Sequence, residues 1–286
     1  MTQPDRSTGV APPALFRAGV IENRRVSKAL RRLTLAVPED WGPPLPGQFV
    51  SLTLERPWDD VGPGRADGPL LRRPFSVSDF RRDGAHCRIE ILYAAVGQVT
   101  GRLALTPSGT ELDLLGPLGT SFPSEGLADP VLVAGGRGVA PFVFYARARA
   151  RRGLAFTLIY GARTGAELVA LPELPADHVH LASEDGARGT CGTAGALLDA
   201  RGAGHDGPIL SCGPHGMLHA VAAWARSRGR RCWVSVESIF GCGVGLCGGC
   251  AVPARGGGFR WACRDGPVID AEELDWERWA SESTCA

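Results

Sequence analysis

The chain has 286 residues, 44% of them hydrophobic, which is enough to bury a large core and suits about two or three domains. Its 31 basic and 30 acidic residues leave a net charge of +1, which argues against nucleic acid or an anionic membrane as the main partner. We expect residues 1–15 to be a polar tail without a signal peptide, and no run of about 18 apolar residues could span a membrane. The nine cysteines are an odd, clustered set, so we expect metal-binding thiols in a reducing cytoplasm rather than disulfides.

Residues 16–125 predict an antiparallel β-barrel domain. Short runs rich in Val, Leu, Ile and Phe alternate there with Gly and Pro clusters, which is typical of antiparallel strands. The expected strands are Arg17–Val26, Leu30–Val37, Gln48–Leu54, Pro74–Ser78, Arg88–Tyr93 and Glu111–Leu115. Val96–Leu105 has helical spacing, and Arg56–Pro69 is a turn-rich insertion between two strands.

Residues 126–236 predict a different domain, in which strands alternate with helices. The expected strands are Val131–Ala134, Ala155–Tyr160, Val179–Ser183, Pro208–Cys212 and Cys232–Val236. The expected helices are Val139–Arg152, Thr193–Arg201 and Gly216–Arg228. This order indicates a doubly wound parallel sheet, as in nucleotide-binding α/β domains. Residues 237–286 follow as a small third domain with a Gly/Cys-rich segment and a Trp-rich, acidic end.

The strongest chemical signal is a group of four cysteines in that third domain. They are Cys242, Cys247, Cys250 and Cys263. The spacing C-x4-C-x2-C, followed by twelve residues and a fourth Cys, is the plant-type arrangement for a 2Fe–2S cluster. The glycines between them let backbone N–H groups point at sulfur. A structural zinc site or chance are the alternatives, but zinc ribbons usually show two short C-x2-C knuckles. The other thiols with no expected role are Cys87, Cys191, Cys232 and Cys285.

Three further motifs carry weaker signals. Arg73-Pro74-Phe75-Ser76 opens a barrel strand, where an Arg beside a hydroxyl residue can pair with a flavin pyrophosphate, although on this motif alone an ordinary strand with an exposed Arg is the better explanation. The turn from Ala134 to Pro141 joins a strand to a helix, and its glycines allow a phosphate to approach the helix N-terminus. It is not the G-x-G-x-x-G fingerprint, because Pro141 stands at the third Gly position, and such a turn is often only structural.

Cys212 ends a strand of the parallel sheet, at the edge where open sheets bind ligands. There it would face a bound ring, which makes it the candidate catalytic residue. A small buried Cys before a turn is the alternative reading.

Taken in their order along the chain, the four motifs resemble the ferredoxin–NADP reductase superfamily, and within it the electron transfer subunits of NAD-dependent (type B) dihydroorotate dehydrogenases. The resemblance runs from about Phe16 to the C-terminus. The residues that match the two flavin-binding segments are Arg73, Pro74, Phe75, Ser76, Leu92, Tyr93, Gly97 and Thr100. The residues that match the two nicotinamide nucleotide turns are Gly135, Gly136, Gly138, Gly213 and Pro214. Val99 and Ala134 depart from the family pattern, each standing where Gly is usual, and Glu237 matches an acidic residue before the cluster.

The resemblance implies three cofactors: FAD on the barrel, a 2Fe–2S cluster on the four cysteines, and NAD on the parallel sheet. It also implies a partner, an FMN-containing dihydroorotate dehydrogenase catalytic subunit, in a heterotetramer. Electrons would pass from that FMN through the cluster and FAD to NAD+, in pyrimidine biosynthesis, and this chain would not bind dihydroorotate. A flavin belongs between the other two groups because it exchanges both hydride and single electrons. The acidic segment Ser183–Gly186 favours NAD over NADP, since carboxylates repel a 2′-phosphate.

Two alternatives stay open. One is a sibling of the same architecture, the flavin and iron–sulfur subunit of a sulfhydrogenase or of an NADH-dependent ferredoxin–NADP oxidoreductase. The other is a non-enzymatic redox-sensing iron–sulfur protein, which would need the flavin and nucleotide motifs to be degenerate.

Overall fold

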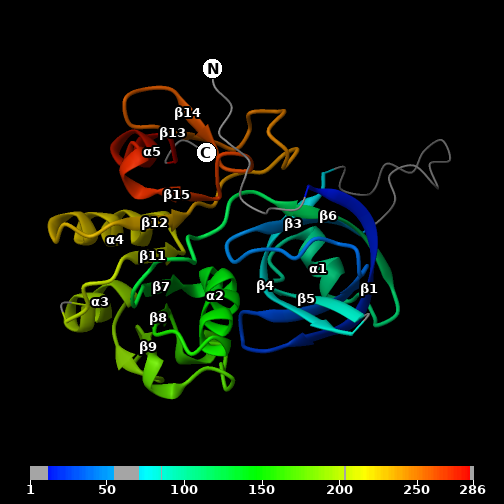
Figure 1. Ribbon diagram of the computed structural model, residues 1–286, viewed down its shortest axis with the longest axis horizontal. Helices are drawn as coiled ribbons and strands as arrows, with labels where there is room; N and C mark the ends of the chain where they lie inside the picture. Colours follow the sequence, from blue (N-terminus) through cyan, green and yellow to red (C-terminus); the bar gives the residue numbers. More distant parts are fainter. Residues whose placement is uncertain (1–11, 55–70, 85, 203, 284–286) are drawn as a thin grey trace.

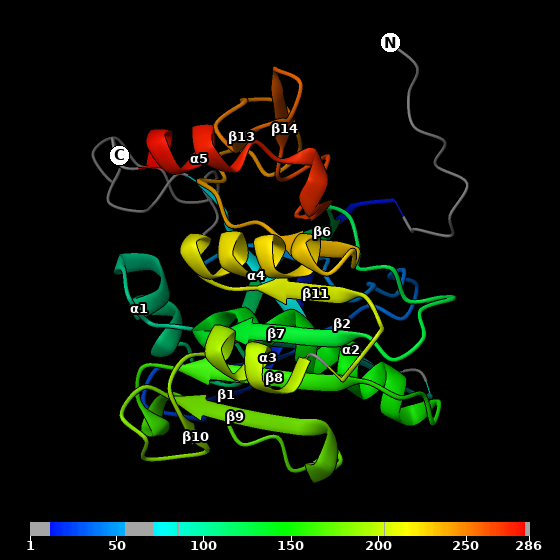
Figure 2. The same ribbon diagram turned by 90° about the vertical axis from the view of Figure 1, so that its left-hand side faces the viewer.

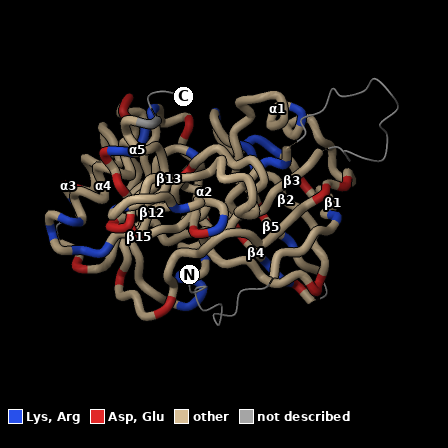
Figure 3. The backbone as a smooth tube through the Cα atoms, turned by 90° about the horizontal axis from the view of Figure 1, so that it is seen from above, with Lys and Arg blue, Asp and Glu red and all other residues tan. Residues whose placement is uncertain are grey.

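The computed structural model describes residues 12–54, 71–84, 86–202 and 204–283, which form a barrel beside a layered α/β unit (Figure 1). The predicted insertion Arg56–Pro69, most of the predicted tail 1–15, and Cys285 lie outside the described residues. Basic and acidic residues are interspersed along the chain, in keeping with its small net charge (Figure 3). Within the described ranges, no helix is long and apolar enough to cross a membrane.

Six antiparallel strands close the predicted barrel in the order β1-β2-β5-β4-β3-β6. The strands are β1 (Ala14–Arg25), β2 (Arg31–Val37), β3 (Phe49–Thr53), β4 (Arg73–Asp83), β5 (His86–Tyr93) and β6 (Glu111–Leu118). Alternation builds the core, because every second residue of a strand faces inward: Cys87, Ile89 and Ile91 of β5 are all buried. The predicted helix is present as α1 (Gln98–Ala104), between β5 and β6.

The predicted parallel sheet is also present, in the strand order β10-β9-β8-β7-β11-β12-β15. Its parallel strands are β7 (Val131–Gly135), β8 (Thr157–Ala162), β9 (Val179–Ser183), β10 (Thr190–Cys191), β11 (Ile209–Cys212) and β12 (Cys232–Ser235). Helices α2 (Val139–Arg151), α3 (Ala194–Gly202) and α4 (His215–Ser227) follow β7, β10 and β11. Figure 2 shows α3 and α4 on one face of the sheet, and α2 packs between the other face and the barrel.

The C-terminal segment returns to this sheet, which the sequence analysis did not predict. A short hairpin, β13 (Ala251–Pro253) and β14 (Phe259–Trp261), precedes β15 (Val268–Asp270), which pairs antiparallel with β12. Helix α5 (Trp276–Ser283) then packs against α4, where Trp276 stacks on His219 at 5.4 Å between ring centroids. Strands of three residues are too short to show a hydrophobic period, so only long-range pairing defines them.

A buried ion network joins the barrel to α2. Arg147 of α2 is only 3% exposed, and its Nη1 donates to the carboxylates of Asp79 at 2.9 Å and Glu90 at 3.0 Å. Its Nη2 donates to Glu173, on the loop that precedes β9. Asp79 lies on β4, is completely buried, and also pairs with Arg81 at 2.8 Å. Each of these buried charges is stabilised by its partners, because an unpaired buried charge would lack both water and a counter-charge.

Replacing Arg147 with Ala should lower the free energy of unfolding by about 3–5 kcal/mol, because Asp79 would lose its buried counter-charge. Denaturant unfolding followed by circular dichroism measures the change. Arg152, exposed and just beyond α2, is the matched control, and Arg152→Ala should shift stability by no more than about 0.5 kcal/mol. Equal unfolding midpoints for the two variants would contradict this role of Arg147.

Candidate functional site

A cleft of about 260 Å³ lies where the barrel, the parallel sheet and the cysteine segment meet. The predicted site residues that line it are Pro74, Phe75, Ser76, Leu92, Tyr93, Thr100 and Cys212. Three parts of the chain that are far apart in sequence therefore share one cavity. The predicted residues Arg73, Gly97, Gly135, Gly136, Gly138, Gly213 and Pro214 lie beside it in the chain but are not part of its lining.

On the barrel side, strands β3, β4 and β5 and the start of α1 form the wall. Phe75 and Tyr93 meet edge to face with 5.9 Å between ring centroids, so two aromatic rings stand together at this wall. The Thr100 hydroxyl accepts hydrogen bonds from the N–H groups of Val96 and Gly97, both at 3.0 Å, and so fixes the turn before α1. Arg73 leads into this wall, and its Nη1 donates to the carbonyl of Leu71 at 3.3 Å.

On the sheet side, the turn after β7 and the turn after β11 touch each other. A Cβ at Gly138 would clash with the carbonyl group of Cys212, and one at Gly135 would lie 2.9 Å from Cδ of the rigid Pro214 ring. These two glycines are therefore required by the packing of the turns. Gly136 differs, because its φ of +53° is left-handed and a Cβ there would meet nothing within 4 Å. This glycine leaves open space beside the N-terminus of α2.

Cys212 is 3% exposed and faces the cleft from the end of β11. Burial, and secondarily the nearby Glu237 carboxylate, raises the pKa of its thiol to about 12. Cys212 is therefore a neutral thiol at physiological pH and can pack against an uncharged ring, but it is not a thiolate nucleophile.

The sequence analysis missed several lining residues. Phe240 and Phe49 line the cleft with 5.1 Å between ring centroids, and they join the cysteine segment to β3. Arg137 also lines the cleft, where it forms an ion pair of 3.2 Å with Glu237, the acidic residue that the sequence analysis had matched to the family. An aromatic residue two positions before the first clustered cysteine was a usable signal for Phe240. Phe49 offered none, because it reads as an ordinary strand residue.

The four predicted cluster cysteines come together as two pairs. The Sγ atoms of Cys250 and Cys263 are 3.2 Å apart and buried, whereas Cys242 and Cys247 lie on the outer side of the loop. The backbone N–H of Cys247 donates to Sγ of Cys242 at 3.4 Å, which places these two side by side. Within the described residues, no three His, Cys, Asp or Glu side chains form a group that could hold a single metal ion.

Backbone N–H groups surround the sulfur atoms, as the glycine content predicts. Leu246 donates to Sγ of Cys242 at 3.2 Å, and Gly245 donates to Sγ of Cys263 at 3.1 Å. Burial would raise the pKa of Cys242, but the N–H groups of Val244, Leu246 and Cys247 outweigh it and bring that pKa down to about 6. Two thiol pairs with N–H donors fit a cluster of two irons, each held by two thiolates, better than a tetrahedral zinc site.

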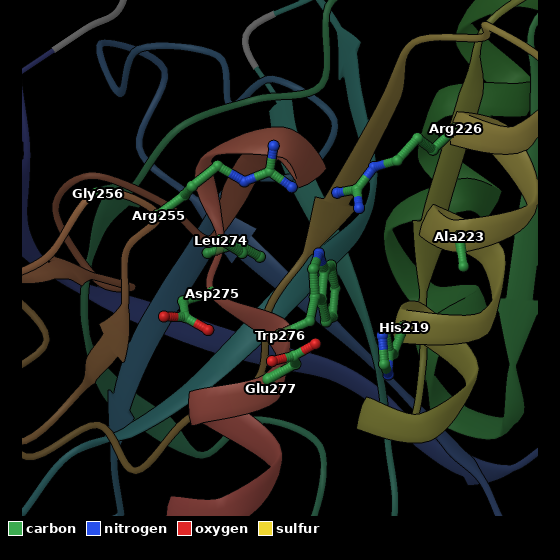
Figure 4. A pocket seen from close by; sticks show the side chains of 9 residues that line it. All are labelled: His219, Ala223, Arg226, Arg255, Gly256, Leu274, Asp275, Trp276 and Glu277. Carbon is green, nitrogen blue, oxygen red and sulfur yellow. The ribbon is translucent and has the colours of Figure 1, made fainter.

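Another cavity, of about 270 Å³, lies between α4, the β13–β14 turn and α5, and contains none of the predicted site residues (Figure 4). Glu272 bridges Arg226 at 2.6 Å and Arg255 at 2.9 Å beside it. These ion pairs fasten the C-terminal segment to α4, so we assign this cavity to the packing of the segment.

Curated relatives identify the family. A dihydroorotate dehydrogenase B (NAD(+)) electron transfer subunit of Geobacillus kaustophilus is 36% identical over 235 residues, which cover 80% of this chain and 86% of the relative. The chain belongs to this family. The corresponding subunit of Geobacillus thermodenitrificans is 32% identical over 264 residues, covering 90% of this chain and 97% of the relative. The family model for the iron–sulfur cluster binding domain of dihydroorotate dehydrogenase B matches residues 237–275.

The family's fold is found in solved structures. An NADH-dependent reduced ferredoxin–NADP oxidoreductase superimposes with a TM-score of 0.78 and 26% identity, covering 94% of this chain and 93% of that one. The ferredoxin reductase of carbazole 1,9a-dioxygenase gives a TM-score of 0.63 at 25% identity, covering 77% of this chain and 67% of that one. The predicted architecture, a barrel, a doubly wound sheet and a C-terminal iron–sulfur segment, is confirmed.

At about pH 8, a thiol-alkylating reagent should modify the exposed Cys191 and leave Cys212 unmodified. The reason is that a pKa of about 12 keeps Cys212 protonated until far higher pH, and its burial blocks access. Peptide mapping by mass spectrometry over a time course measures both sites in one sample. Labelling of Cys212 as fast as Cys191 would show that the thiol is neither buried nor protonated.

Proposed function

We propose that the chain is the electron transfer subunit of a dihydroorotate dehydrogenase, which takes electrons from a catalytic partner subunit and delivers them to NAD+ for pyrimidine biosynthesis. The observation that carries this proposal is the single cleft shared by the barrel, Cys212 and the segment that leads into the four thiols. The curated relatives that carry this name support it. When bound, a flavin exchanges electron pairs with nicotinamide and single electrons with an iron–sulfur cluster, which is the chemistry that such a cleft calls for.

A second candidate function is a subunit of an NADH-dependent ferredoxin–NADP oxidoreductase, which the structural neighbour of that name supports. The sequence relatives favour dihydroorotate dehydrogenase over it. Both candidates use the same three-part division, in which we assign FAD to residues 16–125, the nicotinamide nucleotide to residues 126–236 and the cluster to residues 237–286.

For FAD, we assign the barrel wall. Phe75 and Tyr93 would pack against the flavin ring, while the Ser76 hydroxyl and the Arg73 guanidinium would bind its polar groups and pyrophosphate. Pro74, Leu92 and the turn from Gly97 to Thr100 shape the same wall. The mixed apolar and polar lining of the cleft fits an aromatic ring system with a polar edge.

For the nicotinamide nucleotide, we assign the two touching turns. The open space at Gly136 would admit a phosphate to the start of α2, whereas Gly135, Gly138 and the Gly213-Pro214 turn hold the two loops in contact. The Cys212 thiol would pack against the nicotinamide ring where the end of β11 lines the cleft.

We propose NAD rather than NADP as the nucleotide. Of the two carboxylates after β9, Asp185 accepts hydrogen bonds from the N–H groups of Gly165 and Ala187, so it is committed to the turn. Glu184 is exposed, and a negative side chain there opposes a 2′-phosphate.

For the cluster, we assign the four thiols Cys242, Cys247, Cys250 and Cys263. Their pairing and the N–H groups around them support a 2Fe–2S group at this loop. We propose a reducing cytoplasm as the setting, because clustered thiols stay available to a metal there.

For the partner, we assign the outer face of the cysteine loop. Ile239 is 76% exposed, Val244 is 42% exposed and Leu246 is 85% exposed, and all three flank the thiols in sequence. Exposed apolar side chains in one segment are typical of an interface. We propose that the FMN-containing catalytic subunit covers them in a heterotetramer.

Replacing Cys247 with Ser should abolish the visible and paramagnetic signals of the cluster and leave bound flavin at one per chain, because the thiols and the barrel wall are separate. Absorption spectroscopy, electron paramagnetic resonance and flavin quantitation check this. Cys191→Ser, at the exposed thiol of β10, is the control and should keep both groups. A purified wild-type protein with neither flavin nor iron–sulfur cluster would contradict the proposed function.

Replacing Leu246 with Lys should weaken association with the catalytic subunit by about tenfold or more, because a charge would be buried at the interface. Size-exclusion chromatography and titration calorimetry of the two subunits measure this. Ile21→Lys, at another half-exposed apolar residue far along the chain on β1, should leave association unchanged. NADH oxidation with an artificial acceptor should be the same in both variants; unchanged binding by Leu246→Lys would remove this face from the interface.

A further inference from the structure

A basic cavity lies on the barrel–α2 joint, away from the cleft. It has a volume of about 510 Å³ and is lined by Phe80, Arg81, Arg82, Arg147, Ala150, Arg151 and Glu173. The cleft touches α2 at Ala140, seven residues before Arg147, so the two cavities are about 10 Å apart along this helix, and they share no lining residue. The basic cavity is therefore not an extension of the flavin or nucleotide sites.

Positive charge is in excess around this cavity. The guanidinium groups that line it or share its carboxylates are those of Arg32, Arg81, Arg82, Arg147 and Arg151. The carboxylates are those of Asp79, Glu90 and Glu173. In addition, Arg81, which pairs with Asp79, lies directly opposite Arg88 in the β4–β5 register, so a further positive charge stands beside the cavity.

Hydrogen-bond donors also remain unused here. The Nε of Arg147 is buried and has no hydrogen-bond partner, although its Nη atoms bind three carboxylates. Arg82 donates to the carbonyl of Glu39 at 3.0 Å, and no ion pair is formed by its guanidinium within the described chain. Arg151 is half exposed and forms an ion pair of 3.6 Å with Oδ1 of Asp79, a distance too long for a hydrogen bond.

We propose that this cavity binds a phosphate-bearing small molecule. A phosphate carries about two negative charges and several acceptor oxygens, which match the surplus guanidiniums and their free donors. The volume exceeds that of a bare phosphate ion and leaves room for an organic group beside Phe80 and Ala150. Because Arg82 belongs to the barrel and Arg151 to α2, a bound phosphate bridges the two units and stabilises their joint.

The test uses the full-length, FAD-loaded protein, so that the flavin site is occupied. Inorganic phosphate is titrated in chloride buffer at constant ionic strength, with binding measured by calorimetry and Tm by thermal unfolding. We expect saturable binding to one site and a rise in Tm. Arg82→Ala and Arg151→Ala should each weaken binding by about tenfold, since each removes a charge-assisted hydrogen bond. Arg82→Lys should retain part of the affinity.

Arg152→Ala is the matched control, because Arg152 is the exposed neighbour of Arg151 and does not line the cavity. Ribose 5-phosphate and ribose form the other arms. Tighter binding of ribose 5-phosphate than of phosphate supports an organic phosphate as ligand, and equal binding supports phosphate itself. Absence of saturable binding, binding of ribose alone, or an equal loss in Arg152→Ala and Arg82→Ala would overturn the proposal.

Discussion

The geometry of the cleft depends on the buried Arg147, which holds the barrel and the parallel sheet in one fixed arrangement. The cleft is walled by both units, so a small rotation between them would change its width and separate Phe75 from Cys212. An apolar contact would allow such sliding, whereas a guanidinium that satisfies carboxylates on β4, β5 and a loop of the sheet unit has only one good geometry. The network thus fixes the orientation of the barrel relative to the sheet more than it adds to the free energy of unfolding. Much of the attraction between its charges only offsets the cost of removing them from water.

Within that fixed frame, the close contact of two turns sets the chemistry of the sheet side. Gly138 can approach the Cys212 carbonyl only because it has no side chain, and this contact brings the start of α2 beside the end of β11. The same crowding buries the Cys212 thiol and keeps it protonated. On the opposite side, the ring of Phe240 connects the cleft to a loop whose N–H groups point at sulfur. One wall therefore suits an uncharged ring, and the other suits an anionic cluster.

Most of the fold could be predicted from sequence because its elements are locally encoded. Val179–Ser183 was predicted with the bounds that β9 has, and the thiol spacing singled out four cysteines that the fold brings together as two pairs. Strand β4 runs to Asp83, five residues past the predicted end, because its charged half is held by pairing with β5 rather than by its own pattern. The sequence could not predict that Arg147 links the two domains. In an Arg-rich helix it has the pattern of a surface residue, and only its partners on β4 and β5 bury it.

Strand β15 has a consequence for how such a chain can evolve. It is made by residues that follow the last clustered cysteine, yet it completes the edge of the nucleotide sheet by pairing with β12. The bridge between Ala254 and Leu274 ties the hairpin to the same segment. The iron–sulfur segment therefore shares a sheet with the nucleotide domain and is not an independent domain joined to it by a linker. Recombination that replaced this segment as a whole would remove the edge strand β15 from the nucleotide-domain sheet. The sequences of β15 and β12 are therefore expected to change together.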